Sequence, residues 1–264
     1  MTLETILDNL WVQYCTDNPL VEKVHTLIET KENATIVNDH IAFRTFDHHE
    51  INLDAMAQHF INLGYEEKQE YIFTEKKLRA KHYEKEGCPK IFISELKLKM
   101  FSMRFNEIIE GILEQIPVHH MQNVQSLWSG IQWDMIDSET YEELRQESEY
   151  GAWLATFGFR ANHFTVSVND LRCFELSSLN RLLKSNEIPL NTVGGEIKGN
   201  AREDLLEQSS TLADIRMVQF SDIIVEVPCC YYEFAQRFPL EDGTLFQGFV
   251  TDNADKIFES TDKQ

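Results

Sequence analysis

The length, composition and charge of this chain set the first limits on what it can be. It has 264 residues, of which 42% are hydrophobic and 26% are charged, as is typical of a globular protein with a buried core. The formal net charge is −20, from 44 acidic and 24 basic residues, and such a surface repels nucleic acid and anionic membranes, so we expect neither as a partner. It also repels a dicarboxylate, so a diacid substrate would need a local cation.

The cysteines and the first residues bear on the cellular compartment. Five cysteines occur at irregular spacing with no CxxC pair, which argues against a disulfide framework and against a zinc ribbon. The opening segment, MTLETILDNLWVQY, lacks the basic residues that begin a signal peptide, and the sequence has no apolar run of about 18 residues. We therefore expect a cytoplasmic protein with reduced thiols.

The first half of the chain predicts helices followed by a strand-rich unit. Apolar residues recur at helical spacing over residues 3–30, with a break at Pro19. Residues 36–46, IVNDHIAFRTF, alternate in the manner of a strand. A helix and two short strands are then predicted at 53–63, 70–74 and 90–97. Residues 101–157 carry apolar residues at three- and four-residue spacing, which predicts a helical insertion packed on the sheet.

The second half predicts a similar unit. The strand 163–168 is followed by a predicted helix and two strands at 171–185, 215–220 and 228–235. The polar stretch 191–211 is predicted to be an ordered loop with a short helix rather than a strand. The tail, 244–260, predicts a turn and a short amphipathic segment.

The two units form a weak internal repeat, because NDHIAFRTF aligns with ANHFTVSVN when their histidines are superposed. We predict an α+β fold in which two βαβββ modules pair into an open, cupped mixed sheet, with N-terminal helices and a helical insertion. Matching positions of the two modules should then face each other inside the cup. The predicted division of a single catalytic domain, residues 1–264, is N-terminal helices 1–32, first module 33–100, helical insertion 101–160, second module 161–250 and tail 251–264.

Strand alternation gives each key strand one apolar face and one face with a polar group among small residues. The polar faces are His40, Ala42 and Arg44, then His163, Thr165 and Ser167, then Tyr231, Glu233 and Ala235. A cavity lined by two imidazoles and one carboxylate matches an iron(II) site with open positions, but zinc could use the same ligands as a hydrolytic centre. The residues alone leave both metals open. They also leave Glu226 as good a candidate for the acidic ligand as Glu233.

Arg44 is the candidate cation for an acidic substrate. It follows His40 by four residues on the same strand face, about 13 Å along the strand. Its guanidinium could grip a carboxylate with two parallel hydrogen bonds, or it could pair with one of the protein's own acids. Other histidines are less promising: the pairs His48–His49 and His119–His120 are predicted on surface turns, and His82 among charged, solvated residues.

Several segments of the chain resemble one known family. They are, in chain order, NDHIAFRTF, RANHFTV, GGEIKG, EQSST, PCCYYEFAQR and DKIFEST. The family is that of the 2-oxoadipate dioxygenase/decarboxylases, once known only as a domain of unknown function, and the resemblance extends from about residue 35 to residue 262. It implies a vicinal-oxygen-chelate-like fold, in agreement with the paired modules.

The resemblance also implies a site and a reaction. It places metal ligands at His40, His163 and Glu233, in preference to Glu226, and an essential arginine at Arg44. It implies iron(II) as the cofactor, and O2 and a 2-oxo diacid such as 2-oxoadipate as substrates that bind beside the two histidines and Arg44. The diacid would lose CO2 and become hydroxylated, giving 2-hydroxyglutarate, a step in lysine catabolism. Arg44 would fix the distal carboxylate.

Two other functions remain open at this point. A zinc-dependent hydrolase or lyase could use the same ligands, and a non-enzymatic binding module could keep the fold. Candidates to close the pocket are Gln208, Ser209 and the Gly248–Phe249 turn.

Overall fold

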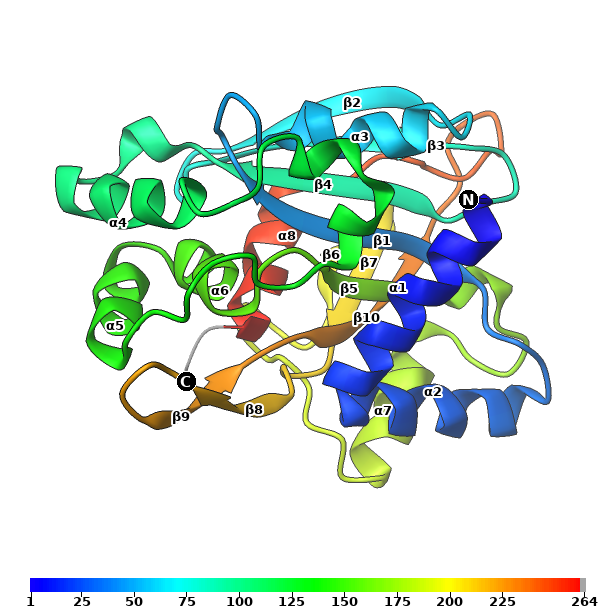
Figure 1. Cartoon of the computed structure of the whole chain (residues 1–264). Helices are drawn as coiled ribbons and strands as arrows, with labels where there is room; N and C mark the ends of the chain where they lie inside the picture. The colour runs from blue at the N-terminus through cyan, green and yellow to red at the C-terminus, as the bar shows by residue number, and fades with distance from the viewer. Residues whose placement is uncertain (262–264) are drawn as a thin grey trace.

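Figure 1 shows the computed structural model, which describes residues 1–261. Eight strands form its central sheet: β1 Asn38–Phe46, β2 Glu66–Phe73, β3 Leu78–Glu84, β4 Lys90–Leu96, β5 Ala161–Ser167, β6 Lys198–Asn200, β7 Leu206–Ser210 and β10 Tyr231–Arg237. Their order across the sheet is β2-β3-β4-β1-β5-β10-β7-β6. Strands from the two halves of the chain therefore meet at the centre, where β1 pairs with β5.

The sheet consists of two related halves. Helix α3, Leu53–Ile61, follows β1, and helix α7, Leu176–Ser185, follows β5, so the halves read β1-α3-β2-β3-β4 and β5-α7-β6-β7-β10. β1 and β5 are antiparallel to each other, and each has a parallel partner on its outer side, β4 and β10 respectively. The prediction of two paired βαβββ modules in an α+β fold is confirmed.

Three details of the sheet differ from the sequence prediction. Strand β3 was not predicted, because its charged residues (LRAKHYE) mask its alternation. The stretch 191–211, predicted as a loop with a short helix, contains β6 and β7, and that prediction was wrong. β7 is polar because its inward side chains line the cup, whereas a strand facing a hydrophobic core would be apolar.

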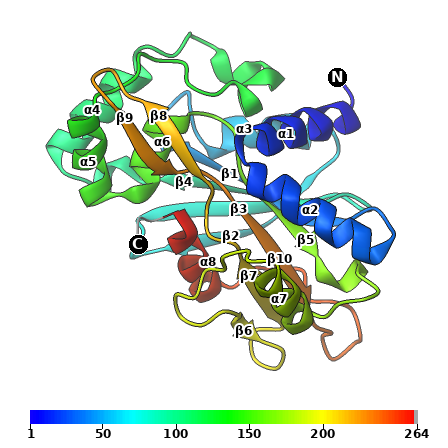
Figure 2. The same cartoon turned by 90° about the horizontal axis from the view of Figure 1, so that it is seen from below.

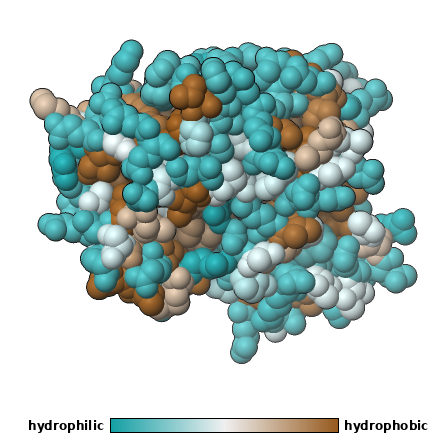
Figure 3. Space-filling view, in the orientation of Figure 1, coloured by the Kyte–Doolittle hydropathy of each residue, from teal (hydrophilic) through white to brown (hydrophobic). Residues whose placement is uncertain are grey.

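The third difference is a separate hairpin. β8, Ile215–Gln219, pairs only with β9, Ile224–Pro228, in a two-stranded sheet, so the strand predicted at 215–220 lies outside the central sheet. One face of the hairpin stays exposed and apolar, and Figure 3 shows hydrophobic residues gathered at the corresponding lower left of the molecule. The large exposed apolar residues there are Ile215, Met217, Ile223 and Ile224.

Two N-terminal helices, α1 Leu3–Asp17 and α2 Pro19–Glu32, cover β5 and β10 on the outer side of the sheet (Figure 2). Pro19 is the first residue of α2, where its missing N–H costs nothing, so the predicted break is confirmed. Trp11 packs edge-on against Phe164 at a centroid distance of 5.0 Å, and His25 Nδ1 lies 2.9 Å from the Tyr232 hydroxyl. These contacts bury the apolar face of β5 and β10 and leave the opposite face to the cup.

Three α-helices lie between the two modules in sequence: α4 Met103–Leu113, α5 Ser138–Glu147 and α6 Glu149–Phe157. The helical prediction for 101–157 is correct at both ends, but between α4 and α5 the chain forms only short 3₁₀ turns. Helix α6 is buried along its length after its first residue. Its side chains close one end of the cup.

The last described segment is helix α8, Thr251–Phe258, followed by a 3₁₀ turn at Glu259–Thr261. The predicted turn and amphipathic segment of the tail are thus confirmed. Helix α8 lies close to β6, β7 and β2, so it covers the open side of the cup. Within residues 1–261, no helix has both the length and the apolar character needed to cross a membrane.

Candidate metal and substrate site

The two predicted histidines occupy equivalent positions on the central strands. His40 of β1 lies opposite Thr165, and His163 of β5 lies opposite Ala42, so a two-fold rotation exchanges the two pairs. The register shifts beside each histidine and skips the preceding residue, Asp39 on β1 and Asn162 on β5. Such bulges redirect side chains locally, and here they bring each skipped side chain to the ring of its own histidine.

This local geometry fixes how the imidazoles face the cup. His40 donates from Nδ1 to Asp39 Oδ1 at 2.7 Å, and His163 donates from Nδ1 to Asn162 Oδ1 at 3.0 Å. With Nδ1 protonated, Nε2 of each ring carries a lone pair directed into the cup. A hydrogen bond to the other ring nitrogen is the usual support for a metal-binding histidine.

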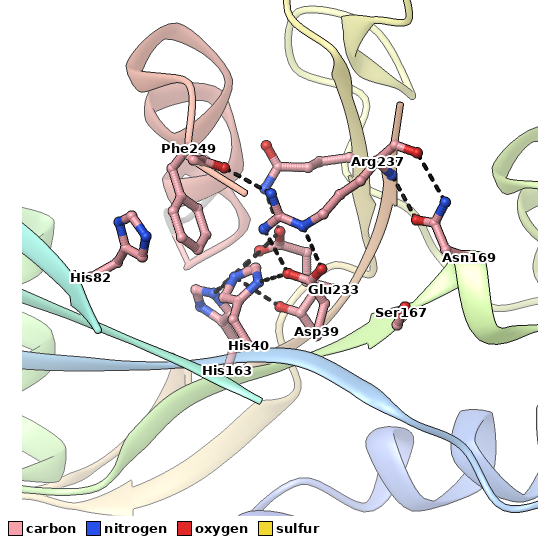
Figure 4. A network of polar contacts seen from close by, with 12 residues as sticks. Asp39, His40, His82, His163, Ser167, Asn169, Glu233, Arg237 and Phe249 are labelled. Atoms are coloured by element: carbon pink, nitrogen blue, oxygen red, sulfur yellow. Dashed lines mark hydrogen bonds and ion pairs between the residues drawn. The ribbon is translucent and has the colours of Figure 1, made fainter. Parts of the chain in front are cut away.

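Glu233 on β10 completes the group. Its carboxylate lies 3.2 Å from His163 Nε2 and 3.8 Å from His40 Nε2, and the two Nε2 atoms are 3.4 Å apart (Figure 4). All three side chains are buried, and each offers a ligand atom within 4.8 Å of the others. The alternative acid, Glu226, lies exposed on the separate hairpin strand β9. The structure therefore brings together His40, His163 and Glu233.

The electrostatics of this group favour a bound cation. Burial raises the pKa of Glu233, because a carboxylate is costly in a water-poor site. Burial also lowers the pKa of His163 well below its usual value, and the nearby charges of His40 and Arg44 add to this effect. Two imidazoles and one buried carboxylate are the donor set of a divalent transition metal, so the site can hold such an ion.

A buried ion pair supports His40 from behind. Asp39 accepts hydrogen bonds from Arg237 Nε at 2.6 Å and from Arg237 Nη2 at 2.9 Å. Arg237 Nη1 also donates to the carbonyls of Phe246 and Gly248, which holds the turn that carries Phe249. The Phe249 ring lies edge-on to His40 at a centroid distance of 4.8 Å. Arg237 thus connects a histidine of the site to its apolar cover.

The two-fold symmetry is broken where the third ligand lies. Thr165 pairs with Glu233 on β10, and its symmetry mate Ala42 pairs with Phe92 on β4. The place that mirrors the carboxylate is therefore filled by an apolar ring. The site accordingly has three ligand groups and an apolar side.

A small cavity of about 20 Å³ adjoins the ligand atoms. It is lined by the three ligand residues, by Gln208 and by four apolar residues, Phe92, Phe249, Ala254 and Ile257. Gln208 donates to Glu233 Oε1 at 2.6 Å, and Ala254 and Ile257 belong to α8. A cavity of this size holds about one water molecule, so a diacid needs movement of the cover.

Arg44 lies on the same face as His40, at the end of the cup closed by α6. It is 1% exposed, donates to Glu149 Oε1 at 3.0 Å and to Thr261 Oγ1 at 3.0 Å, and stacks on the rings of Tyr150 and Trp153. Arg44 is therefore paired with one of the protein's own acids, and its charge acts on His163, while its role toward a substrate stays a prediction. It does not line the small cavity.

The remaining predictions concern the other histidines and the residues expected to close the pocket, and some of them were wrong. His82, predicted to be solvated, is 2% exposed, bonds the Tyr71 hydroxyl and lies 5.3 Å from the Phe249 ring, because the unpredicted strand β3 points it into the cup. Ser209 faces away and donates to Asn180 of α7, so it does not close the pocket, whereas Gln208 and Phe249 do line it. His48–His49 and His119–His120 lie on surface turns, as predicted.

Sequence reasoning missed three supporting residues, Asp39, Asn162 and Arg237. The repeat held a usable signal for the first two, because each is a short polar residue directly before the aligned histidine. Simple alternation assigns such neighbours to the opposite face, and only the bulges reverse that assignment. Arg237 lies almost 200 residues from Asp39 in sequence, and no local pattern connects them.

Comparisons with known proteins find relatives that match over nearly the whole chain. A family model described as 2-oxoadipate dioxygenase/decarboxylase matches residues 6–244. A chloroplastic protein of that name from Arabidopsis thaliana is 32% identical over 97% of this chain and 76% of its own length. A hydroxyglutarate synthase from Oryza sativa, solved in complex with 2-oxoadipate, has a TM-score of 0.92 and 31% identity, covering 97% of this chain and 91% of that one.

A protein of Shewanella frigidimarina NCIMB 400 is closer in sequence and is named as a hydrolase. It is 45% identical, with a TM-score of 0.89, and the match covers 94% of this chain and 97% of that one. The shared fold of these proteins extends over nearly the whole chain.

Proposed function

This chain belongs to the 2-oxoadipate dioxygenase/decarboxylase family, and from that premise we propose that it is an iron(II)-dependent enzyme acting on a 2-oxo diacid such as 2-oxoadipate. The overall reaction would be 2-oxoadipate and O2 to 2-hydroxyglutarate and CO2, in which both oxygen atoms are consumed by one substrate. The observation that carries the proposal is the convergence of His40, His163 and Glu233 in the cup.

The proposed cofactor is iron(II), held by His40, His163 and Glu233. When bound, iron(II) would supply the redox chemistry that activates O2 for oxidative decarboxylation and hydroxylation. The protein's part is to orient both imidazoles so that each Nε2 faces the cup, which Asp39 and Asn162 do through the Nδ1 hydrogen bonds. Phe92 and Phe249 form a dry wall beside the ligands, and this wall limits side reactions with water.

Arg44 is proposed to orient the substrate. Its guanidinium is held rigidly by Glu149 and by the rings of Tyr150 and Trp153, so it loses little freedom when a carboxylate binds. An approaching substrate carboxylate would replace the hydroxyl of Thr261, which is uncharged and therefore a weaker partner than Glu149. Arg44 would then decide which carbon of the diacid lies nearest the metal.

The test is oxygen consumption by metal-depleted protein reloaded anaerobically with iron(II) and then mixed with 2-oxoadipate and air. We expect one CO2 and one 2-hydroxyglutarate per O2, and no turnover by His40→Ala protein. The His48→Ala variant is the matched control, because His48 lies on a surface turn after the same strand. Absence of O2 uptake across a panel of 2-oxo diacids would refute the proposal.

The same assay addresses the zinc-dependent alternative. Zinc-loaded protein that hydrolyses or cleaves a substrate without O2, while iron-loaded protein stays inactive, would favour a hydrolase or lyase. Family membership favours the dioxygenase instead. A cytoplasmic location and a place in lysine catabolism stay predictions, and fractionation of cells with detection of the protein would test the location.

A further inference from the structure

Lys198 is a buried cation beside the metal site. It lies on β6, is 1% exposed, and donates from Nζ to the backbone carbonyl of Asn191 at 2.6 Å. An ammonium group has three donors, and within residues 1–261 this is the single hydrogen bond recorded for Nζ. Lysine is rarely buried without an acidic partner, so this position needs an explanation.

The other buried cations of the described chain each have such a partner. Arg44 is 3.0 Å from Glu149, and Arg237 is 2.6 Å from Asp39. Lys81, which is 9% exposed, lies 2.9 Å from Asp54 and 3.0 Å from Glu67. Among residues 1–261, Lys198 is the buried cation for which no ion pair is recorded. A surplus positive charge is costly in the interior unless a ligand balances it.

The strand register directs Lys198 toward the site. It pairs with Gln208 across the antiparallel strands β6 and β7, and directly opposed residues in such a pair point to the same face. Gln208 points to the ligands, since it donates to Glu233 at 2.6 Å. The strands β10, β7 and β6 are neighbours, and the register places Lys198 in line with Ala235, two residues along β10 from Glu233. Lys198 therefore starts about 12 Å from Glu233, and its long side chain spans part of that distance.

The electrostatic surroundings agree with this placement. Burial lowers the pKa of Lys198 to about 8, while the negative charge of Glu233 acts in the opposite direction. The ammonium is therefore still mostly charged at neutral pH. Because the charges of Lys198 and Glu233 interact, Lys198 contributes to the electrostatic potential of the metal site.

Charge balance then identifies what Lys198 pairs with. If the proposed function holds, a divalent ion is balanced by Glu233 and by the substrate carboxylate next to the keto group. The distal carboxylate of a diacid still needs a positive charge, yet Arg44 is already balanced by Glu149 and Arg237 by Asp39. We propose that Lys198 is a substrate-binding residue that pairs with the distal carboxylate and so makes the site selective for diacids.

Arg44 and Lys198 would then have different roles toward the substrate. Arg44 is stacked and paired, which suits it to orient the same distal carboxylate without adding net charge. Lys198 supplies the net charge that a chain of formal charge −20 must offer to attract a dianion. The acceptor of Lys198, Asn191, also donates to Ser260 Oγ at 2.8 Å, so this polar region lies under the segment that covers the cup.

The experiment compares Lys198→Met and Lys198→Arg with the wild-type protein and with Lys184→Met. Lys184 is an exposed lysine paired with Glu196 on the surface, so its variant controls for loss of one charge. The readout is kcat/KM for 2-oxoadipate divided by kcat/KM for 2-oxohexanoate, which has the same chain length but no distal carboxylate. Loss of a buried charged pair is expected to reduce this ratio roughly 100-fold in Lys198→Met protein. Lys198→Arg should restore part of it.

Binding of glutarate to zinc-loaded protein, measured by calorimetry, gives a second readout that needs no turnover. We expect weaker binding by Lys198→Met protein and unchanged binding by Lys184→Met protein. An unchanged substrate ratio or unchanged glutarate affinity in Lys198→Met would overturn the assignment of Lys198 while leaving the dioxygenase intact. Wild-type protein that oxidises no 2-oxo diacid, by contrast, would refute the proposed function itself.

Stability separates a binding role from a structural one. Removal of a buried charge that has no acidic partner relieves its desolvation cost but leaves the Asn191 carbonyl without its donor, so the Tm of the metal-free protein should change little. If Lys198→Met lowers the Tm and affects both substrates equally, Lys198 is a structural residue and the inference is wrong.

Discussion

Asp39 and Arg237 form a buried pair, with Nε and Nη2 of the arginine 2.6 and 2.9 Å from the two carboxylate oxygens. Asp39 Oδ1 also accepts from His40 Nδ1. Arg237 therefore acts on His40 through Asp39, and it lowers the pKa of Asp39 well below its usual value, against the effect of burial. Arg237 thus keeps Asp39 ionised next to His40, a histidine that we propose as a metal ligand.

Substitution of Arg237 by Gln should weaken metal binding. The loss would leave Asp39 without its ion-pair partner and His40 less well oriented, and loss of such outer support typically costs 10- to 100-fold in metal affinity. Equilibrium dialysis with cobalt(II) or zinc(II) measures this affinity. Arg104→Gln, which removes an exposed arginine paired with Glu143, is the control and should bind metal normally. Equal affinities for both variants would show that Arg237 has no influence on the ligand.

Substitution of Arg44 by Lys should separate metal binding from turnover. Lysine keeps the charge but cannot form the two-pronged contact or the stacking on Tyr150 and Trp153. We expect normal metal affinity and a loss of most turnover with 2-oxoadipate, on the order of 100-fold or more. Steady-state O2 uptake on iron-loaded protein is the measurement. Turnover at the wild-type rate would remove Arg44 from its proposed role.

Substitution of Glu233 by Gln should stabilise the metal-free protein and abolish the further stabilisation that a bound metal ion gives. Burial raises the pKa of Glu233 in the folded protein above its unfolded-state value of about 4.5. The protonated side chain therefore adds to the free energy of unfolding below that pH, and this contribution is lost as the pH rises through the folded-state pKa. At pH 7 the buried carboxylate therefore costs stability, and a neutral amide removes that cost.

Denaturant unfolding with and without zinc(II) tests this prediction. We expect the free energy of unfolding of metal-free Glu233→Gln protein to exceed that of the wild type at pH 7, and the difference to shrink toward pH 4. Zinc(II) should stabilise the wild type but not the variant. Glu226→Gln, on the exposed hairpin, should behave like the wild type in every respect. A less stable Glu233→Gln protein at pH 7 would contradict the prediction.

Helix α8 should open to admit substrate and close over it. The cavity beneath Ala254 and Ile257 holds about one water molecule, and a six-carbon diacid is much larger. Amide hydrogen exchange in residues 251–258 should therefore be faster in metal-free protein and slow down when zinc(II) and glutarate bind. Exchange in α7, on the outer side of the sheet, serves as the internal reference. Identical exchange of α8 with and without ligand would argue against this movement.

The sequence, together with the family resemblance that it carries, was sufficient to predict the two paired modules and the group His40, His163 and Glu233. Alternation along 36–46 and 163–168, together with the two aligned histidines, predicts strands that the structure confirms as β1 and β5. The choice of Glu233 needed the family resemblance, because strand phase treats Glu226 and Glu233 alike. Only the chain's path, which sends β9 into a separate hairpin, distinguishes them physically.

What the sequence could not reveal depends on bulges and on distant contacts. The position of Asp39 beside His40 arises from a register shift, which periodicity does not encode. β6 and β7 were missed because their inward residues are polar, and the rule that buried strands are apolar fails where a strand lines a ligand site. Lys198 went unnoticed for the same reason, since a lysine in a polar stretch reads as solvated.

Glu233 and Phe92 stand at corresponding positions of the two halves of the sheet, and this difference affects how many ligands the protein offers to a metal ion. A carboxylate at position 92 would occupy the mirror image of Glu233 and give a site with four protein ligands, leaving less room for a bidentate acid and O2. One phenyl ring thus sets the coordination number that the protein imposes. Two identical halves would offer four ligand groups, and the difference at this one position reduces them to three.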